Sequence, residues 1–353
     1  APVCAAALRF LQVDIVGALD PQRLQSALDS VLAQQPMLLA RLAKAPGLHG
    51  LRQFAGAAER FPLTVQARVV TPAEIQAQLA EWAERCHLVG ESEGAQAVLY
   101  RLADDRWQLV VGLARHCFDD SGVRLLYQQL LLTYAQETAQ DDEETGEFSQ
   151  YLEWRSEVVL DEDAAGARVY WQEHLQGADA ELSTPWLAYR NSGAALPSST
   201  AWQSINLEPA LREGLQQLAS SLGQPLEALV QGAWWLLLGR LSGHEQMLVG
   251  ARHDSRDDYD YFSAAVGGFE KTLPLHLSLN ARAPFSTWLA ELAARLEEHR
   301  TWQEYWSAEL APSAARPAYG FTLSRAAQAQ TAAGLQWSAQ SRAESGEALF
   351  ELL

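Results

Sequence analysis

Hydrophobic positions along the chain repeat with two different periods. Residues 5–16, 97–102 and 107–114 are apolar throughout or alternate between apolar and polar side chains, which predicts β-strands. Residues 21–32 and 75–82 instead carry apolar side chains three or four positions apart, which predicts helices with one buried face. Strands and helices therefore alternate in the first half, and we expect a mixed α/β fold.

Two of the expected helices have recognisable starts. Asp20 is placed to cap the first helix, with Pro21 in its first turn, where the missing N–H of proline costs nothing. Thr71 and Glu74 have the spacing of a capping box, in which each side chain binds the other residue's backbone N–H. Both signals place helix starts where the apolar spacing begins.

The second half repeats the same order of elements. Strands are expected over residues 201–207, 247–250, 272–279, 318–323 and 335–338, and helices over 209–222, 225–241 and 284–300. The stretch 225–241 is apolar almost all round, which predicts a central buried helix. The length of 353 residues suits two packed lobes, which we expect at residues 1–160 and 161–353, the second truncated at its end.

A short polar turn, residues 115–121, lies between an expected buried strand over 109–114 and an expected helix over 122–130. It carries one histidine, His116, and two aspartates. A turn held by rigid elements on both sides suits a catalytic or binding group. A single histidine near an aspartate is also common as a hydrogen-bonded structural pair, so both interpretations stay open at this point.

Composition narrows the classes of partner. The formal net charge of −18 argues against nucleic acid and against anionic membrane surfaces, both of which would repel the protein. The three cysteines, Cys4, Cys86 and Cys117, are far apart, which gives no disulfide framework and no zinc pattern and suits a reducing cytoplasm. No apolar run reaches the length of a membrane span, and no metal or tightly bound cofactor is expected.

Four segments, in this order, resemble motifs of one known family. Residues 115–121 resemble its HHxxxDG motif, 170–177 its YWxxxLxG segment, 241–250 its RLSGxxxxxVG segment and 266–275 its VGxFxNTLPL segment. The chain therefore resembles the condensation domains of non-ribosomal peptide synthetases, in the chloramphenicol-acetyltransferase-like superfamily. The resemblance implies a two-lobed α/β sandwich, V-shaped with a central tunnel. It also implies carrier proteins as partners, whose phosphopantetheine arms deliver aminoacyl or peptidyl thioesters into that tunnel.

The resemblance assigns roles to three residues. His116 takes the place of the catalytic histidine of the motif, and Asp120 takes the place of its structural aspartate. The arginine that pairs with this aspartate would be Arg256. We expect an Asp120–Arg256 pair to fix the turn, and removing one partner of such a buried pair costs about 3–5 kcal/mol.

Other motif positions depart from the family pattern. Arg115 replaces the first histidine, Ser121 replaces the glycine and Lys271 replaces the asparagine before Thr-Leu-Pro-Leu. Further candidate positions are Asp119 and Gly122 in the motif, and Lys271 and Thr272 as residues of the tunnel or its latch. If Arg115 faces the tunnel, it lowers the pKa of His116 and repels an ammonium acceptor. If it faces the core, Asp119 is the nearest carboxylate that could pair with it.

Three functions follow from this resemblance. The first is a platform with a degenerate motif that recruits a tailoring enzyme to a carrier-bound amino acid. Domains of this kind recruit cytochromes P450 in glycopeptide assembly, and interface domains recruit β-hydroxylases in siderophore assembly. The second is an active condensation domain that forms an amide bond, with His116 as proton acceptor or orienter. The third is a stand-alone acyltransferase that uses coenzyme A. All three suit a cytoplasmic protein, and whether the chain is an enzyme stays open.

Three other features have both a functional and a structural interpretation. The stretch 252–260 has the residue types of a metal site, but its spacing matches no standard pattern, and we expect a solvated loop. Trp302, Tyr305 and Trp306 form either core or an exposed patch for a partner. Cys117 has no base beside it in sequence, so we expect a small buried side chain and not a nucleophile.

Overall fold

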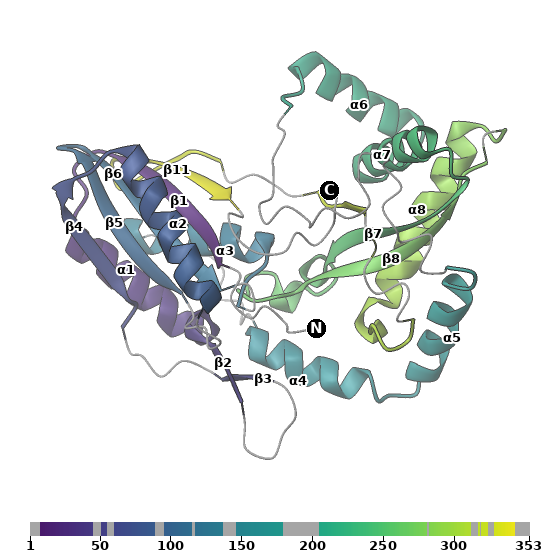
Figure 1. Cartoon of the computed structure of the whole chain (residues 1–353), viewed down its shortest axis with the longest axis horizontal. Helices are drawn as coiled ribbons and strands as arrows, with labels where there is room; N and C mark the ends of the chain where they lie inside the picture. Colours follow the sequence, from purple (N-terminus) through teal and green to yellow (C-terminus); the bar gives the residue numbers. More distant parts are fainter. Residues whose placement is uncertain are drawn as a thin grey trace. The chain divides into compact units, whose positions relative to one another are not determined.

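The computed structural model forms two compact units that are not contiguous in sequence (Figure 1). It describes residues 8–44, 51–54, 60–88, 95–114, 117–136, 146–178, 205–280, 282–311, 317, 319–323 and 328–342. Unit 1 comprises residues 1–152, 259–270 and 324–347, and unit 2 comprises 153–258, 271–323 and 348–353. The two lobes expected at residues 1–160 and 161–353 stay a prediction. After residue 152 the chain returns to unit 1 twice.

Unit 1 is built on a six-stranded sheet. Its strands are β1 (Leu8–Val16), β4 (Leu63–Val69), β5 (Gln96–Ala103), β6 (Arg106–Ala114), β10 (Gln330–Ala332) and β11 (Leu335–Arg342), in the order β10-β11-β1-β6-β5-β4. β1 pairs antiparallel with both β6 and β11, whereas β4 and β5 run parallel. A separate two-stranded sheet joins β2 (Arg41–Lys44) and β3 (Leu51–Phe54). The strands expected over 97–102, 107–114 and 335–338 are confirmed, and the strand expected over 5–16 is confirmed for its described residues 8–16.

Alternation along the strands sends side chains to helices on both faces of this sheet. The helices of unit 1 are α1 (Pro21–Gln34), α2 (Pro72–Leu88) and α3 (Asp120–Ala135), with the short 3-10 helices η1 (Pro36–Leu39) and η3 (Asp260–Phe262). Leu11 and Val111 belong to a buried cluster with α1 and α3. Their neighbours Phe10 and Val110 point the other way and pack with α2. Strand β6, which leads into the polar turn before α3, is therefore covered by core on both faces.

One glycine of β6 is needed for this packing. A Cβ added at Gly112 would lie 2.5 Å from a ring carbon of Trp82 on α2. Trp82 also packs edge-on against Phe10, with ring centroids 5.2 Å apart. Gly112 therefore lets an indole ring lie directly on the strand that leads into the polar turn.

The expected helix caps are present. The Asp20 carboxylate accepts a hydrogen bond from the backbone N–H of Gln22 at 2.9 Å. In the capping box, the N–H of Thr71 donates to the Glu74 carboxylate at 2.7 Å, and the N–H of Glu74 donates to Thr71 Oγ1 at 3.3 Å. Both predicted starts are confirmed to the residue.

Unit 2 has a three-stranded sheet in the order β8-β7-β9. Its strands are β7 (Gln246–Asp254), β8 (Glu270–Ser278) and β9 (Gly320–Phe321), and its helices are α5 (Ala164–His174), α6 (Pro209–Ser221), α7 (Leu226–Ser242), α8 (Phe285–Thr301), η2 (Ser255–Asp257) and η4 (Gln303–Tyr305). Helix α4 (Phe148–Val158) spans the boundary between the units. Val249 of β7 packs with α7 and α8, whereas its neighbour Leu248 packs with Trp171 of α5. Both faces of this sheet therefore contribute to the core.

Two expectations for unit 2 are wrong. Helix α7 is not buried all round, because Trp235 and Leu238 face the core while Leu237 and Leu241 are 49% and 65% exposed. Residues 205–207 form no strand, and the preceding residues 201–204 lie outside the described part of the chain. Ile205 is 80% exposed, so its apolar side chain has no core to enter. In both segments the prediction of burial rested on apolar composition alone, and the structure leaves some of these apolar side chains exposed to solvent.

Candidate functional site

The polar turn between β6 and α3 is organised by Asp119. Asp119 caps α3, with one carboxylate oxygen accepting the N–H of Gly122 at 2.6 Å. The other oxygen accepts the N–H groups of Phe269 and Glu270 at 2.7 and 3.0 Å. The side chain is almost fully buried, at 4% exposure. A buried carboxylate with three backbone donors joins the start of α3 to the segment that leads into β8.

Glu270 completes this arrangement from the other direction. Its carboxylate accepts the N–H of Ser121 at 3.0 Å, one residue before the amide that Asp119 caps. The N–H groups of the first helical turn have no partner within the helix, so they normally bind a cap, water or an anion. Here two carboxylates of the same chain accept hydrogen bonds from two of these N–H groups.

The positions predicted from the motif have different outcomes. Arg115 and His116 lie outside the described residues, so their expected roles stay predictions. Asp120 is the first residue of α3 and is partly exposed. Arg256 lies in unit 2, where it binds the Asp254 carboxylate at 2.9 and 3.1 Å. The Asp120–Arg256 pair would join the two units and stays a prediction.

Cys117 has the role expected of a small buried side chain. It is 1% exposed, and its Sγ donates to the carbonyl oxygen of Ala40 at 3.3 Å. Burial raises the pKa of the thiol to about 12. The thiolate that a cysteine nucleophile requires is therefore absent at neutral pH.

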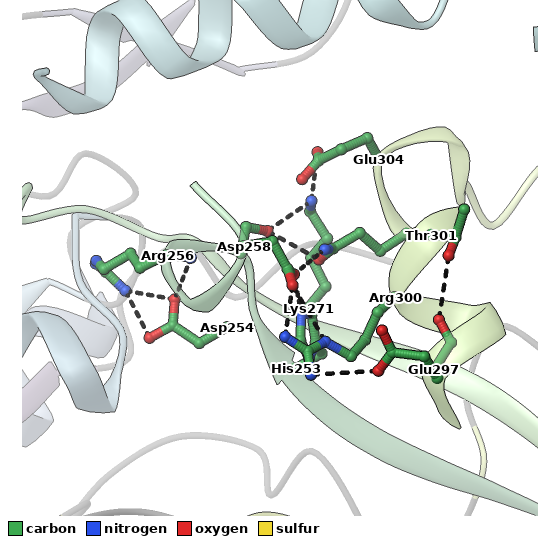
Figure 2. A network of polar contacts seen from close by, with 11 residues as sticks. His253, Asp254, Arg256, Asp258, Lys271, Glu297, Arg300, Thr301 and Glu304 are labelled. Carbon is green, nitrogen blue, oxygen red and sulfur yellow. Dashed lines mark hydrogen bonds and ion pairs between the residues drawn. The ribbon is translucent and has the colours of Figure 1, made fainter. Parts of the chain in front are cut away.

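Residues 252–258 of unit 2 form the end of β7, the helix η2 and a packed polar network, which corrects the expectation of a solvated loop over 252–260, although Asp257 and Asp260 are exposed. Asp258 accepts a hydrogen bond from Arg300 at 2.6 Å and lies 2.6 Å from His253 Nε2 (Figure 2). Gln303 also donates to the Asp258 carboxylate, at 2.6 Å. Burial by itself would raise the pKa of Asp258, but the hydrogen bonds from His253 and Arg300 outweigh it and lower the pKa to about 2. Ser255 in the same stretch is fully buried. Sequence spacing gave no sign of these partners because Arg300 and Gln303 come from the end of α8 and from η4.

Lys271, at the asparagine position of the family segment, joins the same network. Its ammonium group pairs with the carboxylate of Glu304 and donates to Ser255 Oγ at 2.9 Å. Arg155 of α4 approaches the same carboxylate at 3.3 Å. Burial lowers the pKa of Lys271 to about 8, although Glu304 opposes this shift. Lys271 and Thr272 remain candidates for a tunnel or latch role.

Sequence reasoning missed Glu270 and Glu304. Glu270 occupies a variable position of the family segment, and Glu304 lies among aromatic residues, where no sequence pattern marks a carboxylate. The aromatic residues themselves are intermediate between core and surface: Trp302, Tyr305 and Trp306 are partly buried. Across the described residues, no group of histidine, cysteine and carboxylate side chains could hold a metal ion.

A second buried cluster in unit 2 surrounds His299. The Tyr170 hydroxyl lies 2.8 Å from His299 Nδ1, and His299 Nε2 donates to the carbonyl oxygen of Pro274 at 3.0 Å. The His174 ring stands edge-on to it, with centroids 4.3 Å apart. Burial lowers the pKa of His299 to about 4, and burial with the nearby charges of His299 and Arg295 lowers that of His174 to about 2. Both rings are therefore neutral in the folded protein near pH 7.

These two histidines predict acid lability. Because both pKa values are lower folded than unfolded, the unfolded state binds more protons below pH about 6.5. The contribution of these two histidines to the free energy of unfolding is expected to be constant above that pH. It should then fall by as much as about 1.4 kcal/mol per pH unit for each histidine as the pH drops. Urea unfolding of the wild type and of His174→Gln between pH 7.5 and 4.5 measures this slope.

The variant should show a smaller slope than the wild type. The matched control is His244→Gln, because His244 is exposed and lies outside the His299 cluster. A wild-type stability that stays flat between pH 6.5 and 5 would contradict the prediction.

Comparison with known proteins decides the family. Residues 11–317 match the family model described as "Condensation domain". The chain belongs to the condensation-domain family. This condensation domain is 28% identical over 236 residues to one polypeptide of the linear gramicidin synthase of Brevibacillus parabrevis. That match covers 65% of the chain and 4% of the synthase polypeptide, so the chain spans a small part of this relative.

Solved structures share the fold of this condensation domain. The SgcC5 protein from Streptomyces globisporus matches with a TM-score of 0.75 at 20% identity, over 98% of this chain and 82% of that one. A complex of the X-domain and OxyB from teicoplanin biosynthesis matches with a TM-score of 0.72 at 21% identity, over 98% of this chain and 77% of that one. The expected chloramphenicol-acetyltransferase-like α/β fold is thereby confirmed. In the described part of this condensation domain, every helix is too short or too polar to cross a bilayer.

Proposed function

We propose that this condensation-like domain no longer forms amide bonds and serves as a platform that recruits a tailoring enzyme to a carrier-bound amino acid. One observation carries the proposal. The backbone N–H groups of Ser121 and Gly122 at the start of α3 are occupied by the carboxylates of Glu270 and Asp119.

Amide formation requires stabilisation of a tetrahedral oxyanion, and backbone N–H groups near the motif are suitable donors. In this chain the two amides at the helix start already have anionic partners within the protein. The carboxylates would also repel a developing negative charge at short range. Two carboxylates bound to these amides therefore stabilise the turn and disfavour the formation of an oxyanion, which amide synthesis requires.

The buried position of Asp119 also affects how the HHxxxDG motif is aligned. If Asp119, and not Asp120, is its structural aspartate, the two histidine positions fall on Ala114 and Arg115. Alanine cannot accept a proton, and a guanidinium stays protonated at any physiological pH. This alignment leaves His116 outside the catalytic position and favours the platform. The alignment on Asp120 keeps His116 catalytic and favours an active domain.

The proposal includes the partners that the family implies. Condensation domains of peptide synthetases work with carrier proteins, so the amino acid would be tethered to a phosphopantetheine arm, and the domain itself would hold no tight cofactor. The recruited enzyme would be a β-hydroxylase, as in siderophore assembly, or a cytochrome P450, acting in the cytoplasm. The teicoplanin X-domain, which shares this fold, was solved in complex with OxyB.

A condensation assay with loaded donor and acceptor carrier proteins tests the proposal. We expect no amide product above background from the wild type or from His116→Ala. We also expect a tailoring enzyme from the same gene cluster to co-purify with both proteins when a loaded carrier is present.

The alternatives give different results in the same experiment. An amide product that disappears in His116→Ala would overturn the platform in favour of an active condensation domain. Acyl transfer from coenzyme A to a small free acceptor would instead indicate a stand-alone acyltransferase.

A further inference from the structure

Unit 1 contains one segment from the second half of the chain, residues 259–270, which we call the docked segment. Two of its apolar side chains hold it on the unit. Val266 is 2% exposed and belongs to the buried cluster with α1 and α3. Phe269 is fully buried, and its ring packs against that of Tyr151 with centroids 4.5 Å apart. Apolar contacts are not directional, so they do not by themselves fix the segment along its own axis.

Gln35, the residue directly after α1, supplies directional contacts to the docked segment. Its Nε2 donates to the carbonyl oxygen of Ala264 at 3.3 Å, and its Oε1 accepts the N–H of Val266 at 3.1 Å. Gln129 of α3 donates to the same carbonyl oxygen of Ala264 at 2.9 Å. A carboxamide has a donor and an acceptor in one plane, so Gln35 binds this backbone as a neighbouring strand would. The Gln35 side chain is itself held in place, at 9% exposure.

Two glycines, residues 267–268, separate this contact from the next one along the segment. The next contact is Asp119, whose carboxylate accepts the N–H of Glu270 at 3.0 Å. Glycine has more conformational freedom than any other residue, so two glycines in a row keep a fixed path only when the chain is held on both sides. Gln35 holds the segment before these glycines, and Asp119 holds it after them.

We infer that Gln35 is a positioning residue, which fixes the docked segment so that the Glu270 carboxylate meets the N–H of Ser121. That contact is 3.0 Å long. The inference rests on the proposed function, because the proposed function depends on this N–H being occupied. It names the residue that keeps Glu270 in place, although Gln35 lies outside every motif and contacts neither Glu270 nor Ser121 through an interaction of its own side chain with theirs.

The exchange rate of the Ser121 N–H with solvent reports on this contact directly. Ser121 is the second residue of α3, and the N–H groups of the first helical turn have no acceptor within the helix. Its protection from exchange therefore depends on Glu270. The N–H of Leu130, in the middle of α3, is protected by the helix and reports on overall stability.

The test measures amide hydrogen exchange of the full chain by NMR in the wild type, Gln35→Met and Glu270→Ala. The matched control is Gln25→Met. Gln25 lies in α1 and also makes two side-chain hydrogen bonds, to Asp29 and to the carbonyl oxygen of Phe61, neither of which is in the docked segment. The control therefore removes similar contacts from the same helix without touching residues 259–270.

Relative to Leu130, we expect the N–H of Ser121 to exchange at least about tenfold faster in Gln35→Met than in Gln25→Met, because each lost hydrogen bond changes an equilibrium constant by about fivefold. The double variant Gln35→Met with Glu270→Ala should exchange no faster at Ser121 than Glu270→Ala, because Gln35 acts through Glu270. Gln35→Glu keeps an acceptor for the segment and loses the donor, so its rate should lie between those of the wild type and Gln35→Met.

Equal relative rates at Ser121 in Gln35→Met and Gln25→Met would overturn this inference and leave the proposed function intact. A double variant faster than Glu270→Ala would do the same. If Gln35→Met does not fold, Gln35→Glu takes its place in both comparisons. A Ser121 N–H that is unprotected in the wild type would overturn this inference together with the observation that carries the proposed function.

Discussion

Replacing Asp119 with alanine should destabilise the protein by about 3–5 kcal/mol, because three backbone N–H groups lose one shared carboxylate. Loss of a helix cap by itself costs about 0.5–2 kcal/mol. The N–H groups of Phe269 and Glu270 are donors in a buried region, and each donor left without an acceptor costs about 1–3 kcal/mol. Urea unfolding at pH 7, followed by circular dichroism, measures the loss.

The matched control is Asp20→Ala, which removes the cap of α1. Asp20 is exposed and accepts one backbone N–H, so its removal should cost about 1 kcal/mol. Equal losses for the two variants would show that the contacts from Asp119 to residues 269 and 270 contribute nothing. Asp120→Ala, measured beside them, reports on the predicted Asp120–Arg256 pair and therefore on which aspartate is the structural residue of the motif.

Replacing Glu304 with alanine should cost about 3–5 kcal/mol, because it leaves the ammonium group of Lys271 buried without this partner. The side chains of Glu304 and Lys271 are 3% and 13% exposed, so solvent screens the pair only weakly. Arg155 loses its carboxylate partner in the same variant. The pKa of Lys271, already lowered to about 8 by burial, should fall further. Urea unfolding gives the first effect, and ¹⁵N-detected titration of the lysine gives the second.

A double variant separates the charge pair from its packing. Lys271→Met with Glu304→Leu removes both charges and keeps apolar volume, and buried pairs replaced in this way are often neutral or more stable. We expect the double variant to recover at least half of the loss seen in Glu304→Ala. If the losses measured for Lys271→Met and Glu304→Leu separately add up to the loss in the double variant, the two side chains are not coupled and the pair makes no direct contribution to stability.

Local signals in the sequence predicted much of the fold. The capping box at Thr71 and Glu74 and the cap at Asp20 involve residues close in sequence, so spacing alone was sufficient. Alternation correctly gave strands such as β1 and β6, whose two faces both enter the core. The same reasoning failed for α7, where Leu237 and Leu241 are apolar but reach the surface. Periodicity reports which residues are apolar, and only packing decides which face is covered.

The candidate site was predictable as a location but not as a set of contacts. The motif over residues 115–121 pointed to the turn before α3, and Asp119 was among its candidates. The resemblance gave Asp120 a structural role in a pair with Arg256, which stays a prediction, and it gave no sign that the Asp119 carboxylate caps α3. The partners of Asp119 come from residues about 150 positions later, so no local pattern could reveal them. The contact of Glu270 could not be predicted for the same reason, because its carboxylate binds the N–H of Ser121, which is far away in the sequence.

The discontinuous path of unit 1 matters for dividing this chain into fragments. A piece ending near residue 160 would lack β11, which lies beside β1 over seven paired residues. It would also lack the 259–270 segment that supplies two donors to Asp119. The freed edge of β1 would offer a row of backbone groups to any other strand, a common cause of insoluble expression. Such a fragment should therefore be co-expressed with a second piece that contains residues 259–347. The second piece would supply β11 and complete the sheet beside β1.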